Sequence, residues 1–572
     1  MEVIPASVRL AVNGTQQLTV VTVPENLPDV AFTWTSDHSD IATVSDDGLV
    51  TALQTGSATI NVSSGELQKS VSVLVSDQII EVNPPSVILT VNGTQQLTAT
   101  VVPDMPNVVL RWSSDDPAVA VVSDNGLVTA RQMGVTTVRV TAGNMEETVK
   151  VSVGAIGQSE ILSVQNGHLY LGGKKFAEIS FNKFDLFWKL WDAAYAGEVI
   201  NDAHPAVIRQ DEALKELSQH GFKTIRTFCL PFWYKDFKAV YDDPTKRQNV
   251  YYAAIDKMLE LCEKHQLKIV YCLGLTDFIL KDWGLRDDGT YGMIYHEHVA
   301  DLIGDPSSEQ RQRVMTYLDD IIPRYRSSPA IAMWEIANET TLIPDIDPTH
   351  IYDGQRIPTM LQLSEFYRDV TARIKLLDPV RLVNNGGSIL REYAYGLYHG
   401  TGWSKRDTYG QHQEIFDMLY ADTGLGVVDI HYYAIAEGGY RILENDGVTP
   451  LWLDLKKYKA IADDMGFPIY VGEYAALPVN KSDTEFWTNY PDYFDTFDGD
   501  NADALRWVGK ALNDAVNSGI PLIHWWCYQS DREQDQGDPQ RMDLDLQRTP
   551  TLFQMVVNAN HELKEKLGII NN

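Results

Sequence analysis

The stretch from Ile331 to Glu339 decides the fold, and it reads Ile-Ala-Met-Trp-Glu-Ile-Ala-Asn-Glu. It begins as a nearly continuous apolar run and ends in an amide, Asn338, and a carboxylic acid, Glu339. Strands that are buried on both faces are apolar throughout, so this run is typical of a parallel sheet. We expect its polar end at the carboxyl edge of the sheet, where barrel active sites form.

Seven further apolar runs of strand length follow the same pattern after about residue 161, and amphipathic segments such as 210–220 and 250–265 precede most of them. This α/β alternation predicts a parallel sheet, and eight strands fill a (β/α)8 TIM barrel. The predicted strands are Phe176–Phe181, Thr224–Leu230, Lys268–Leu273, Ile331–Ile336, Arg381–Asn384, Val427–Tyr432, Pro468–Val471 and Leu522–Trp526.

The first 154 residues contain a repeat. Val12–Thr19 returns as Val91–Thr98, a shift of 91 − 12 = 79, whereas Trp34 returns as Trp112, a shift of 112 − 34 = 78. One loop residue is therefore missing from the second copy. Each copy alternates apolar and polar residues between Asn-Gly and Asp-Gly turns, which predicts a small all-β sandwich of antiparallel strands.

The residues that recur resemble bacterial immunoglobulin-like group 2 modules over roughly positions 1 to 154. We therefore expect two immunoglobulin-like domains, 1–76 and 77–155, before a barrel domain, 156–572. The resemblance implies a secreted or cell-surface protein, although residues 1–5 do not read as a signal peptide. Because aromatic residues are sparse, a spacer role is favoured over glycan or partner contact, and Trp34 and Trp112 are predicted core anchors.

Composition narrows the class of partner. The formal net charge is −31 without a compensating run of Lys and Arg, so binding to nucleic acid or to an anionic membrane surface is not expected. No apolar stretch approaches the roughly 18–20 residues that membrane insertion requires. The four cysteines lie in apolar segments without metal-ligand spacing, which indicates buried thiols. A neutral polysaccharide or oligosaccharide fits best.

A second carboxyl group lies at the end of the seventh predicted strand, in Val471-Gly472-Glu473-Tyr474. Retaining glycoside hydrolysis needs an acid/base carboxyl and a nucleophilic carboxylate about 5–5.5 Å apart. Glu339 and Glu473 are the candidates. We expect apolar or like-charge surroundings to keep the acid protonated and donors such as Arg226 to keep the nucleophile ionised.

Other polar and aromatic residues lie at neighbouring strand ends. His431 and Tyr433 share one face of the sixth strand, so Tyr433 is placed to donate to Glu473. The eighth strand ends in Trp525-Trp526, of which one is expected to form a sugar platform and the other to pack in the core. Trp233, Trp283 and Trp403 are candidate loop platforms for additional sugar subsites.

With these residues in place, the barrel resembles glycoside hydrolase family 5 over roughly 161 to 572. The resemblance implies Glu339 as acid/base, Asn338 as a ligand of the sugar 2-hydroxyl, and Glu473 as nucleophile. It also implies that Arg226, His431, Tyr433 and Trp526 bind substrate. Many cellulase members of the family carry a histidine at the end of the third strand, where this chain has Cys272–Asp277. The sequences at 225–228 and 328–331 look similar to those of mannan-hydrolysing members.

The activity implied is an endo-β-1,4-mannanase or endo-β-glucanase. An exo-acting β-mannosidase or β-glucosidase is the alternative, because the segments 340–359 and 391–424 could open or block a cleft. From another class, an inactive carbohydrate-binding barrel stays open. The acidic segments 495–501 and 531–545 do not match a calcium loop, no Gly-x-Ser-x-Gly elbow is present, and no metal or cofactor is expected.

Overall fold

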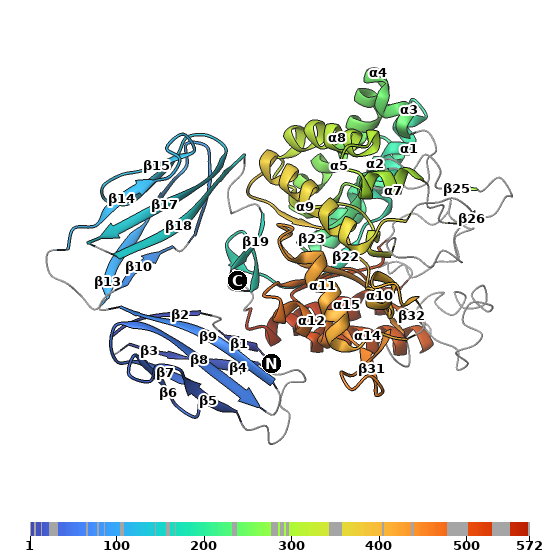
Figure 1. Cartoon of the computed structure of the whole chain (residues 1–572). Helices are drawn as coiled ribbons and strands as arrows, with labels where there is room; N and C mark the ends of the chain where they lie inside the picture. Colours follow the sequence, from blue (N-terminus) through green and yellow to red (C-terminus); the bar gives the residue numbers. More distant parts are fainter. Residues whose placement is uncertain are drawn as a thin grey trace. The chain divides into compact units, whose positions relative to one another are not determined.

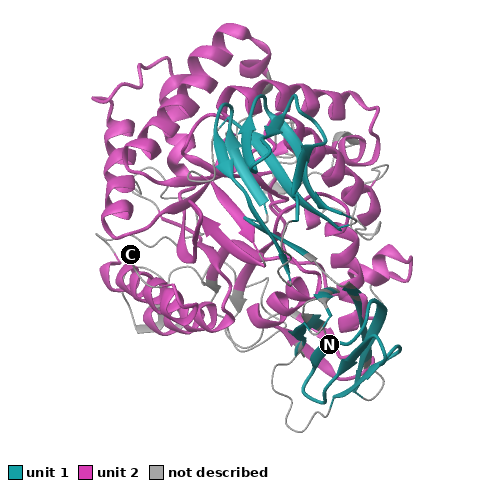
Figure 2. Ribbon diagram, turned by 90° about the vertical axis from the view of Figure 1, so that its left-hand side faces the viewer, with its two compact units in different colours: residues 1–157 teal, residues 158–572 magenta. Residues whose placement is uncertain are grey.

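The computed structural model (Figure 1) divides into two compact units, residues 1–157 and 158–572 (Figure 2). It describes the chain except for residues 1, 5–6, 13, 22–31, 65–66, 77–78, 85, 103–107, 144, 156–160, 166, 231–236, 276–283, 286–290, 293–296, 343–356, 403–404, 436–439, 478–501, 529–548 and 570–572. Within the described part of the chain, every helix falls short of the length and apolar character that a membrane crossing demands.

The first unit contains two β modules with the same succession of strands, as the repeat predicts. The first module comprises β1 (Glu2–Ile4), β2 (Ser7–Ala11), β3 (Thr15–Gln17), β4 (Thr19–Val21), β5 (Thr33–Ser36), β6 (Ala42–Val44), β7 (Leu49–Ala52), β8 (Gly56–Ser64) and β9 (Leu67–Ser76). The second comprises β10 (Ile79–Asn83), β11 (Ser86–Thr90), β12 (Thr94–Gln96), β13 (Thr98–Val102), β14 (Arg111–Ser114), β15 (Ala120–Val122), β16 (Leu127–Ala130), β17 (Gly134–Ala142) and β18 (Met145–Gly154).

The sheets of the two modules match strand for strand. The first module has a sheet in the order β2-β9-β8-β5 and another in the order β3-β7-β6, and the second repeats both orders with β11-β18-β17-β14 and β12-β16-β15. The expectation of purely antiparallel strands is wrong at one pair in each copy, because β2 runs parallel to β9 and β11 runs parallel to β18. The opening strand of each sheet joins the edge beside the closing strand and runs in its direction.

Each module packs its tryptophan against a turn glycine. Trp34 and Trp112 are half-buried against the core of their module, as predicted. A Cβ atom at Gly48 would lie 2.8 Å from the Trp34 ring, and one at Gly126 would lie 3.1 Å from the Trp112 ring. Both glycines have φ near +84°, where a side chain is strained. The repeated Trp and Gly are therefore one packing unit.

The second unit is a parallel (β/α)8 barrel, and all eight predicted strands are confirmed. Its sheet has the order β28-β27-β24-β23-β22-β33-β32-β29, and the seam between β28 and β29 is bridged by the Gly426 N–H, which donates to the Val383 carbonyl at 2.9 Å. The strands are β22 (Glu178–Asn182), β23 (Thr224–Phe228), β24 (Lys268–Cys272), β27 (Ile331–Glu335), β28 (Leu382–Asn384), β29 (Val428–Ile435), β32 (Ile469–Leu477) and β33 (Leu522–Trp525).

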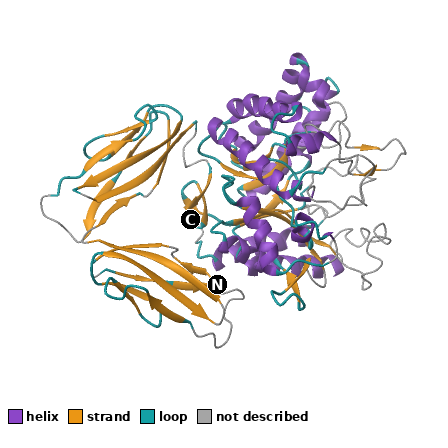
Figure 3. Ribbon diagram, viewed as in Figure 1, coloured by secondary structure: helices purple, strands orange, loops and turns teal. Residues whose placement is uncertain are grey.

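Helices surround these strands (Figure 3), and buried apolar side chains of both form one core. They are α1 (Asp185–Tyr195), α2 (Pro205–Gln219), α3 (Phe237–Asp242), α4 (Pro244–Lys246), α5 (Ala253–Lys264), α7 (Glu297–Gly304), α8 (Glu309–Tyr325), α9 (Met360–Leu377), α10 (Ala394–Tyr398), α11 (Tyr409–Tyr420), α12 (Leu455–Asp464), α14 (Ala502–Ser518) and α15 (Pro550–Lys566), with a π turn at Arg247–Tyr252 and a 3-10 turn at Thr340–Leu342. Two short hairpins, β25 (Gly284–Leu285) with β26 (Tyr291–Gly292) and β30 (Tyr440–Leu443) with β31 (Pro450–Leu453), complete it.

A small antiparallel sheet that sequence reasoning did not anticipate closes the amino end of the barrel. It consists of β19 (Leu162–Gln165), β20 (His168–Leu171) and β21 (Lys174–Lys175). Leu162 and Leu169 of this sheet pack in one apolar cluster with Met333, Tyr470 and Leu522 of the barrel strands. Because this plug fills the amino end, polar chemistry is left to the carboxyl end.

Candidate active site

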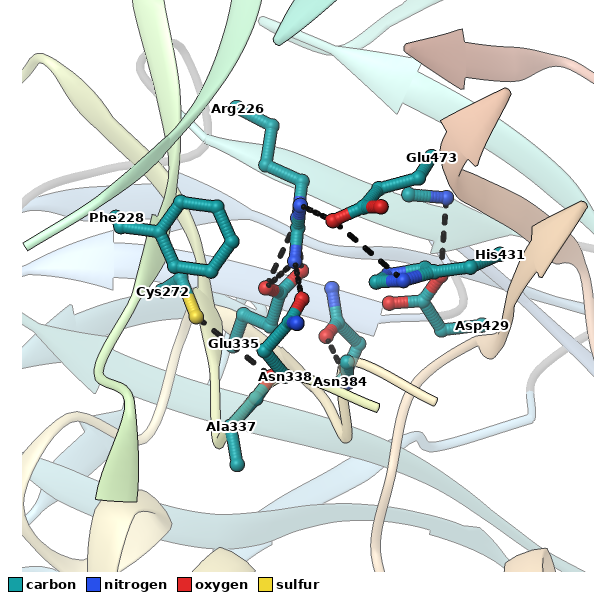
Figure 4. Close-up of polar contacts among 12 residues, drawn as sticks. Arg226, Phe228, Cys272, Glu335, Ala337, Asn338, Asn384, Asp429, His431 and Glu473 are labelled. Carbon is teal, nitrogen blue, oxygen red and sulfur yellow. Dashed lines mark hydrogen bonds and ion pairs between the residues drawn. The ribbon is translucent and has the colours of Figure 1, made fainter. Parts of the chain in front are cut away.

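The candidate site is organised around Arg226, which is fully buried near the carboxyl end of β23 (Figure 4). Its guanidinium donates to Glu335 through Nε at 2.9 Å and through Nη2 at 2.7 Å. Nη1 donates to the Glu473 carboxylate at 2.8 Å, and Nη2 also donates to the Asn338 amide oxygen at 2.8 Å. One buried cation thus ties together the ends of β23, β27 and β32.

Glu473 has a hydrogen-bond donor on each of its two carboxylate oxygens. Oε1 accepts from Arg226, and Oε2 accepts from the Tyr433 hydroxyl. Burial and the neighbouring carboxylates of Glu473 and Glu339 raise the pKa of Tyr433 well above its usual value, so the phenol keeps the proton that it donates. His431 Nδ1 lies 3.6 Å from Oε1 of the same carboxylate. Arg226 and Tyr433 therefore both lie beside Glu473 as donors.

Glu339 stands on a strained backbone beyond the end of β27, with φ of +52°. Its N–H donates to the Gly386 carbonyl at 2.7 Å, and Gly386 itself has φ of +64°. A Cβ atom at Gly386 would lie 1.7 Å from the Ala337 carbonyl oxygen, so only glycine fits there. The backbone after β28 therefore fixes where the Glu339 side chain starts, and backbone strain of this kind is common at functional sites.

The surroundings of Glu339 differ from the expectation. His431 Nδ1 lies 3.1 Å from its carboxylate, and the side chain is 25% exposed. Burial raises the pKa of Glu339, but hydrogen bonds from His431 and Ser388 and the positive charges of His431 and Arg226 outweigh burial and hold the pKa below its usual value. The expectation that apolar or like-charge surroundings keep this acid protonated is therefore wrong, because His431 and Arg226 favour the ionised form of Glu339.

The two glutamates face each other across the barrel mouth. One ligand atom each of Glu339, His431 and Glu473 lies within 4.8 Å of the other two, so the two carboxylates are within that distance. This spacing is also that of a three-ligand metal site. The Arg226 guanidinium, 2.8 Å from Glu473, is a positive charge that would repel a metal cation there.

The two tryptophans at the end of the eighth barrel strand have different surroundings. Trp526 is half-buried beside Phe184 and Phe228, with ring centroids 5.3 Å and 6.2 Å away, and it remains the candidate platform. Trp525 does not line the site, because it is only 1% exposed and its ring packs against Tyr474 in the core. Successive residues of a strand point to opposite faces, so His524 faces the barrel interior while Trp525 faces the helices.

The sequence analysis missed several residues of the site. Glu335 is fully buried against Arg226, Asn182 accepts from Arg226 at 3.0 Å, and Asp429 accepts from the Gly472 N–H at 3.1 Å. A polar residue inside an otherwise apolar strand is a usable signal, and it applies to Glu335 and Asp429. No comparable signal in the sequence pointed to Ser388. The loop residues Trp233, Trp283 and Trp403 and the acidic segments 495–501 and 531–545 lie outside the described residues.

Comparison with known sequences identifies the first unit. The family model of the bacterial Ig-like domain, group 2, matches residues 1–75 and 78–153. An uncharacterised protein of Clostridium acetobutylicum is 33% identical over 136 residues, and ice-binding protein 1 of Shewanella frigidimarina is 30% identical over 132. These matches cover 23% and 22% of this chain, and only 14% and 15% of the relatives' own lengths.

Among solved structures, an endo-1,4-β-mannanase from Rhizomucor miehei is 14% identical, with a TM-score of 0.44, over 71% of this chain and 99% of that one. An exo-β-1,4-mannosidase from Opitutaceae bacterium strain TAV5 is 15% identical, with a TM-score of 0.41, over 71% and 63%. A bacterial Ig-like domain containing GH10 xylanase from termite gut is 15% identical, with a TM-score of 0.35, over 84% and 99%. The family model makes residues 1–75 and 78–153 two bacterial Ig-like domains of group 2, and the strand order of the second unit makes it a parallel (β/α)8 barrel.

Proposed function

We propose that the barrel is a retaining glycoside hydrolase of the family 5 type that cleaves β-linked glycans with Glu473 as nucleophile and Glu339 as acid/base. The observation that carries the proposal is the pair of carboxylates within 4.8 Å at the barrel mouth. Retaining enzymes hold this pair about 5–5.5 Å apart, whereas inverting enzymes leave about 6.5–9.5 Å for a water molecule. The separation here supports direct attack by a carboxylate.

In the first step, a Glu473 oxygen attacks the anomeric carbon while the Glu339 proton passes to the departing glycosidic oxygen. In the second, Glu339 takes a proton from water, the water oxygen bonds to the anomeric carbon, and Glu473 leaves. Arg226 and Tyr433 hold the nucleophile by its two oxygens. Asn338 keeps its amide nitrogen available for a sugar hydroxyl, because its oxygen accepts from Arg226.

The lowered pKa of Glu339 has a consequence for this assignment. A general acid must carry its proton in the free enzyme, and kcat/KM reports the free-enzyme pKa values. His431 contacts Glu339 at 3.1 Å, and its hydrogen bond and charge help to hold the pKa of Glu339 down. We therefore expect an acidic pH optimum, because activity is lost as pH rises through the lowered pKa at which Glu339 gives up its proton.

For the substrate, we propose β-1,4-mannan with endo cleavage. The support is the sequence at 225–228 and 328–331 and the absence of a histidine at the end of β24, where Cys272 points its thiol to the Ala337 carbonyl. Endo-β-glucanase and exo-β-mannosidase or β-glucosidase action remain the competing outcomes. We further propose that the protein is secreted or held at the cell surface, that the boundaries 1–76, 77–155 and 156–572 delimit its domains, and that the Ig-like domains act as spacers or contact glycan.

A panel of aryl β-glycosides tests the proposal. The wild type should hydrolyse at least one of them, and Glu339→Gln and Glu473→Gln should not. Tight sugar binding without hydrolysis would establish the inactive carbohydrate-binding barrel instead. Loss of activity on treatment with a chelator would replace the carboxylate mechanism with a metal at Glu339, His431 and Glu473. Product analysis on mannan, mixed-linkage glucan and xylan then assigns the substrate, and long oligomers at early times establish endo cleavage.

A further inference from the structure

The strand that carries Glu473 has one residue more than its neighbour at the site. Between β29 and β32 the register runs Ile430 with Val471 and then His431 with Glu473, so Gly472 has no partner in β29. On the other side, Gly472 and Glu473 together stand between the pairs Val471 with Ile523 and Tyr474 with Trp525. Gly472 is therefore the extra residue of a β-bulge, a device that re-aims the side chain beside it.

We propose that Asp429 is a positioning residue that fixes this bulge and thereby places the Glu473 carboxylate for attack. The inference rests on the proposed function and adds a residue to it. The Asp429 side chain binds the backbone N–H of Gly472. Its effect passes through the backbone of Gly472 to the next residue, Glu473.

Side chains hydrogen-bond to both polar backbone groups of Gly472. Its N–H donates to Asp429 Oδ1 at 3.1 Å, and its carbonyl accepts from the Asn182 side-chain amide at 2.9 Å. Asp429 and Asn182 are both fully buried. Two buried side chains therefore hold the two polar groups of the bulged residue, and an unsatisfied buried N–H would be costly. Asn182 also accepts from Arg226, so the same network reaches the Glu473 carboxylate from two directions.

Space around Gly472 is equally restricted. A Cβ atom there would lie 2.9 Å from Asp429 Oδ1 and 2.9 Å from His431 Nε2. Both distances are below normal contact, so alanine at this position would displace the Asp429 carboxyl, the His431 ring, or the bulge itself. Within the described residues, neither Asp429 Oδ2 nor His431 Nε2 has a hydrogen-bond partner, so the Asp429 side chain hydrogen-bonds there only to the Gly472 N–H.

The charge state of Asp429 suggests a conservative replacement. Burial raises the pKa of Asp429 well above its usual value, and the nearby carboxylates of Glu335 and Glu473 raise it further against the opposing charge of Arg226. A neutral carboxyl group resembles an amide in size and keeps the acceptor oxygen for the Gly472 N–H. Asp429→Asn should therefore preserve the bulge, whereas Asp429→Leu removes the acceptor at similar volume.

The experiment is a double-mutant cycle on an aryl β-glycoside with an activated leaving group. In Glu473→Ala, azide can take the place of the missing carboxylate: its nitrogen bonds to the anomeric carbon, the bond to the phenol oxygen breaks, and the phenolate leaves. This reaction no longer depends on where Glu473 would stand. We measure kcat and KM for the wild type, Asp429→Asn and Asp429→Leu, and the azide-rescued rate for Glu473→Ala with and without Asp429→Leu.

We expect Asp429→Leu to lower kcat about 100-fold, the effect of roughly 1 Å of misplacement, with KM nearly unchanged. Asp429→Asn should stay within about fivefold of the wild type. In the Glu473→Ala background, Asp429→Leu should leave the azide-rescued rate unchanged, because nothing remains for Asp429 to position. Asp378→Asn, at a buried carboxyl that binds Arg381 and the Trp334 indole outside the site, is the matched control and should lower stability without lowering kcat.

A wild-type kcat in Asp429→Leu would overturn the inference. So would a fall in the azide-rescued rate, on adding Asp429→Leu to Glu473→Ala, as large as the fall in kcat that Asp429→Leu causes alone. If Asp429→Leu does not fold, Gly472→Ala takes its place in the same cycle with the same expected outcomes. A wild type that hydrolyses no glycoside would overturn the proposed function itself, which is a different result from an active enzyme that is indifferent to Asp429.

Discussion

The two ends of the barrel are built on the same eight strands and have opposite characters. At the amino end, Leu162 and Leu169 of the plug pack with apolar residues of the strands. At the carboxyl end, Arg226, Glu339, His431 and Glu473 form one network of ion pairs and hydrogen bonds. Folding free energy should therefore be concentrated at the first end and catalytic chemistry at the second. Substitutions at the two ends should have separable effects.

The largest effect should come from the nucleophile. Glu473→Gln keeps the side-chain shape but removes the negative charge that attacks the sugar, so kcat should fall about 10⁴-fold or more. The melting temperature should stay close to that of the wild type, because the amide can still accept from Arg226. Steady-state kinetics and thermal unfolding of the same preparation check this. Residual activity near the wild-type level would remove Glu473 from the mechanism.

The opposite end should respond in stability alone. Leu162 is fully buried in the plug, so Leu162→Ala should reduce the free energy of unfolding by about 2–5 kcal/mol through lost burial and the cavity it leaves. At a temperature where the variant is folded, kcat should match the wild type. Denaturant unfolding and kinetics provide both numbers. A selective loss of kcat would show that the two ends are coupled rather than independent.

A smaller effect is expected at the second donor of Glu473. Tyr433→Phe removes the hydroxyl that donates to Oε2 and leaves the ring in place. Hydrogen bonds to charged groups contribute about 1.5–3 kcal/mol, so kcat/KM should fall roughly 10- to 100-fold. Kinetics on one aryl β-glycoside test this. An unchanged kcat/KM would mean that Arg226 alone holds the nucleophile.

The smallest effect should be a displacement of the pH profile. His431 favours the ionised form of Glu339, so His431→Leu should raise the pKa of Glu339. A general acid with a higher pKa keeps its proton to higher pH, and the alkaline limb of kcat/KM should move upward. His412→Leu, at another fully buried histidine, serves as the control and should leave the limb in place. A downward movement in His431→Leu would contradict the assignment of Glu339 as the acid.

The strands and the two glutamates were predictable because their signals are local. A continuous apolar run followed by a polar residue marks both the strand and its functional end, as at Ile331–Glu339. The bulge at Gly472, the left-handed backbone of Glu339 and the plug at β19 and β20 depend on contacts between distant segments, and no local pattern announces them. Trp525 and Trp526 show the same limit, since only the register of β33 decides which ring faces the helices.

The stereochemistry of the first product distinguishes two displacements at the anomeric carbon from one. Proton NMR of a wild-type digest of an aryl β-glycoside, recorded before the free sugar mutarotates, identifies the anomer that the enzyme releases. Two displacements at one carbon restore the original configuration, so two carboxylates as close as Glu339 and Glu473 predict a β-anomer at the earliest time points. An α-anomer released first would require a single displacement by water and would contradict the account.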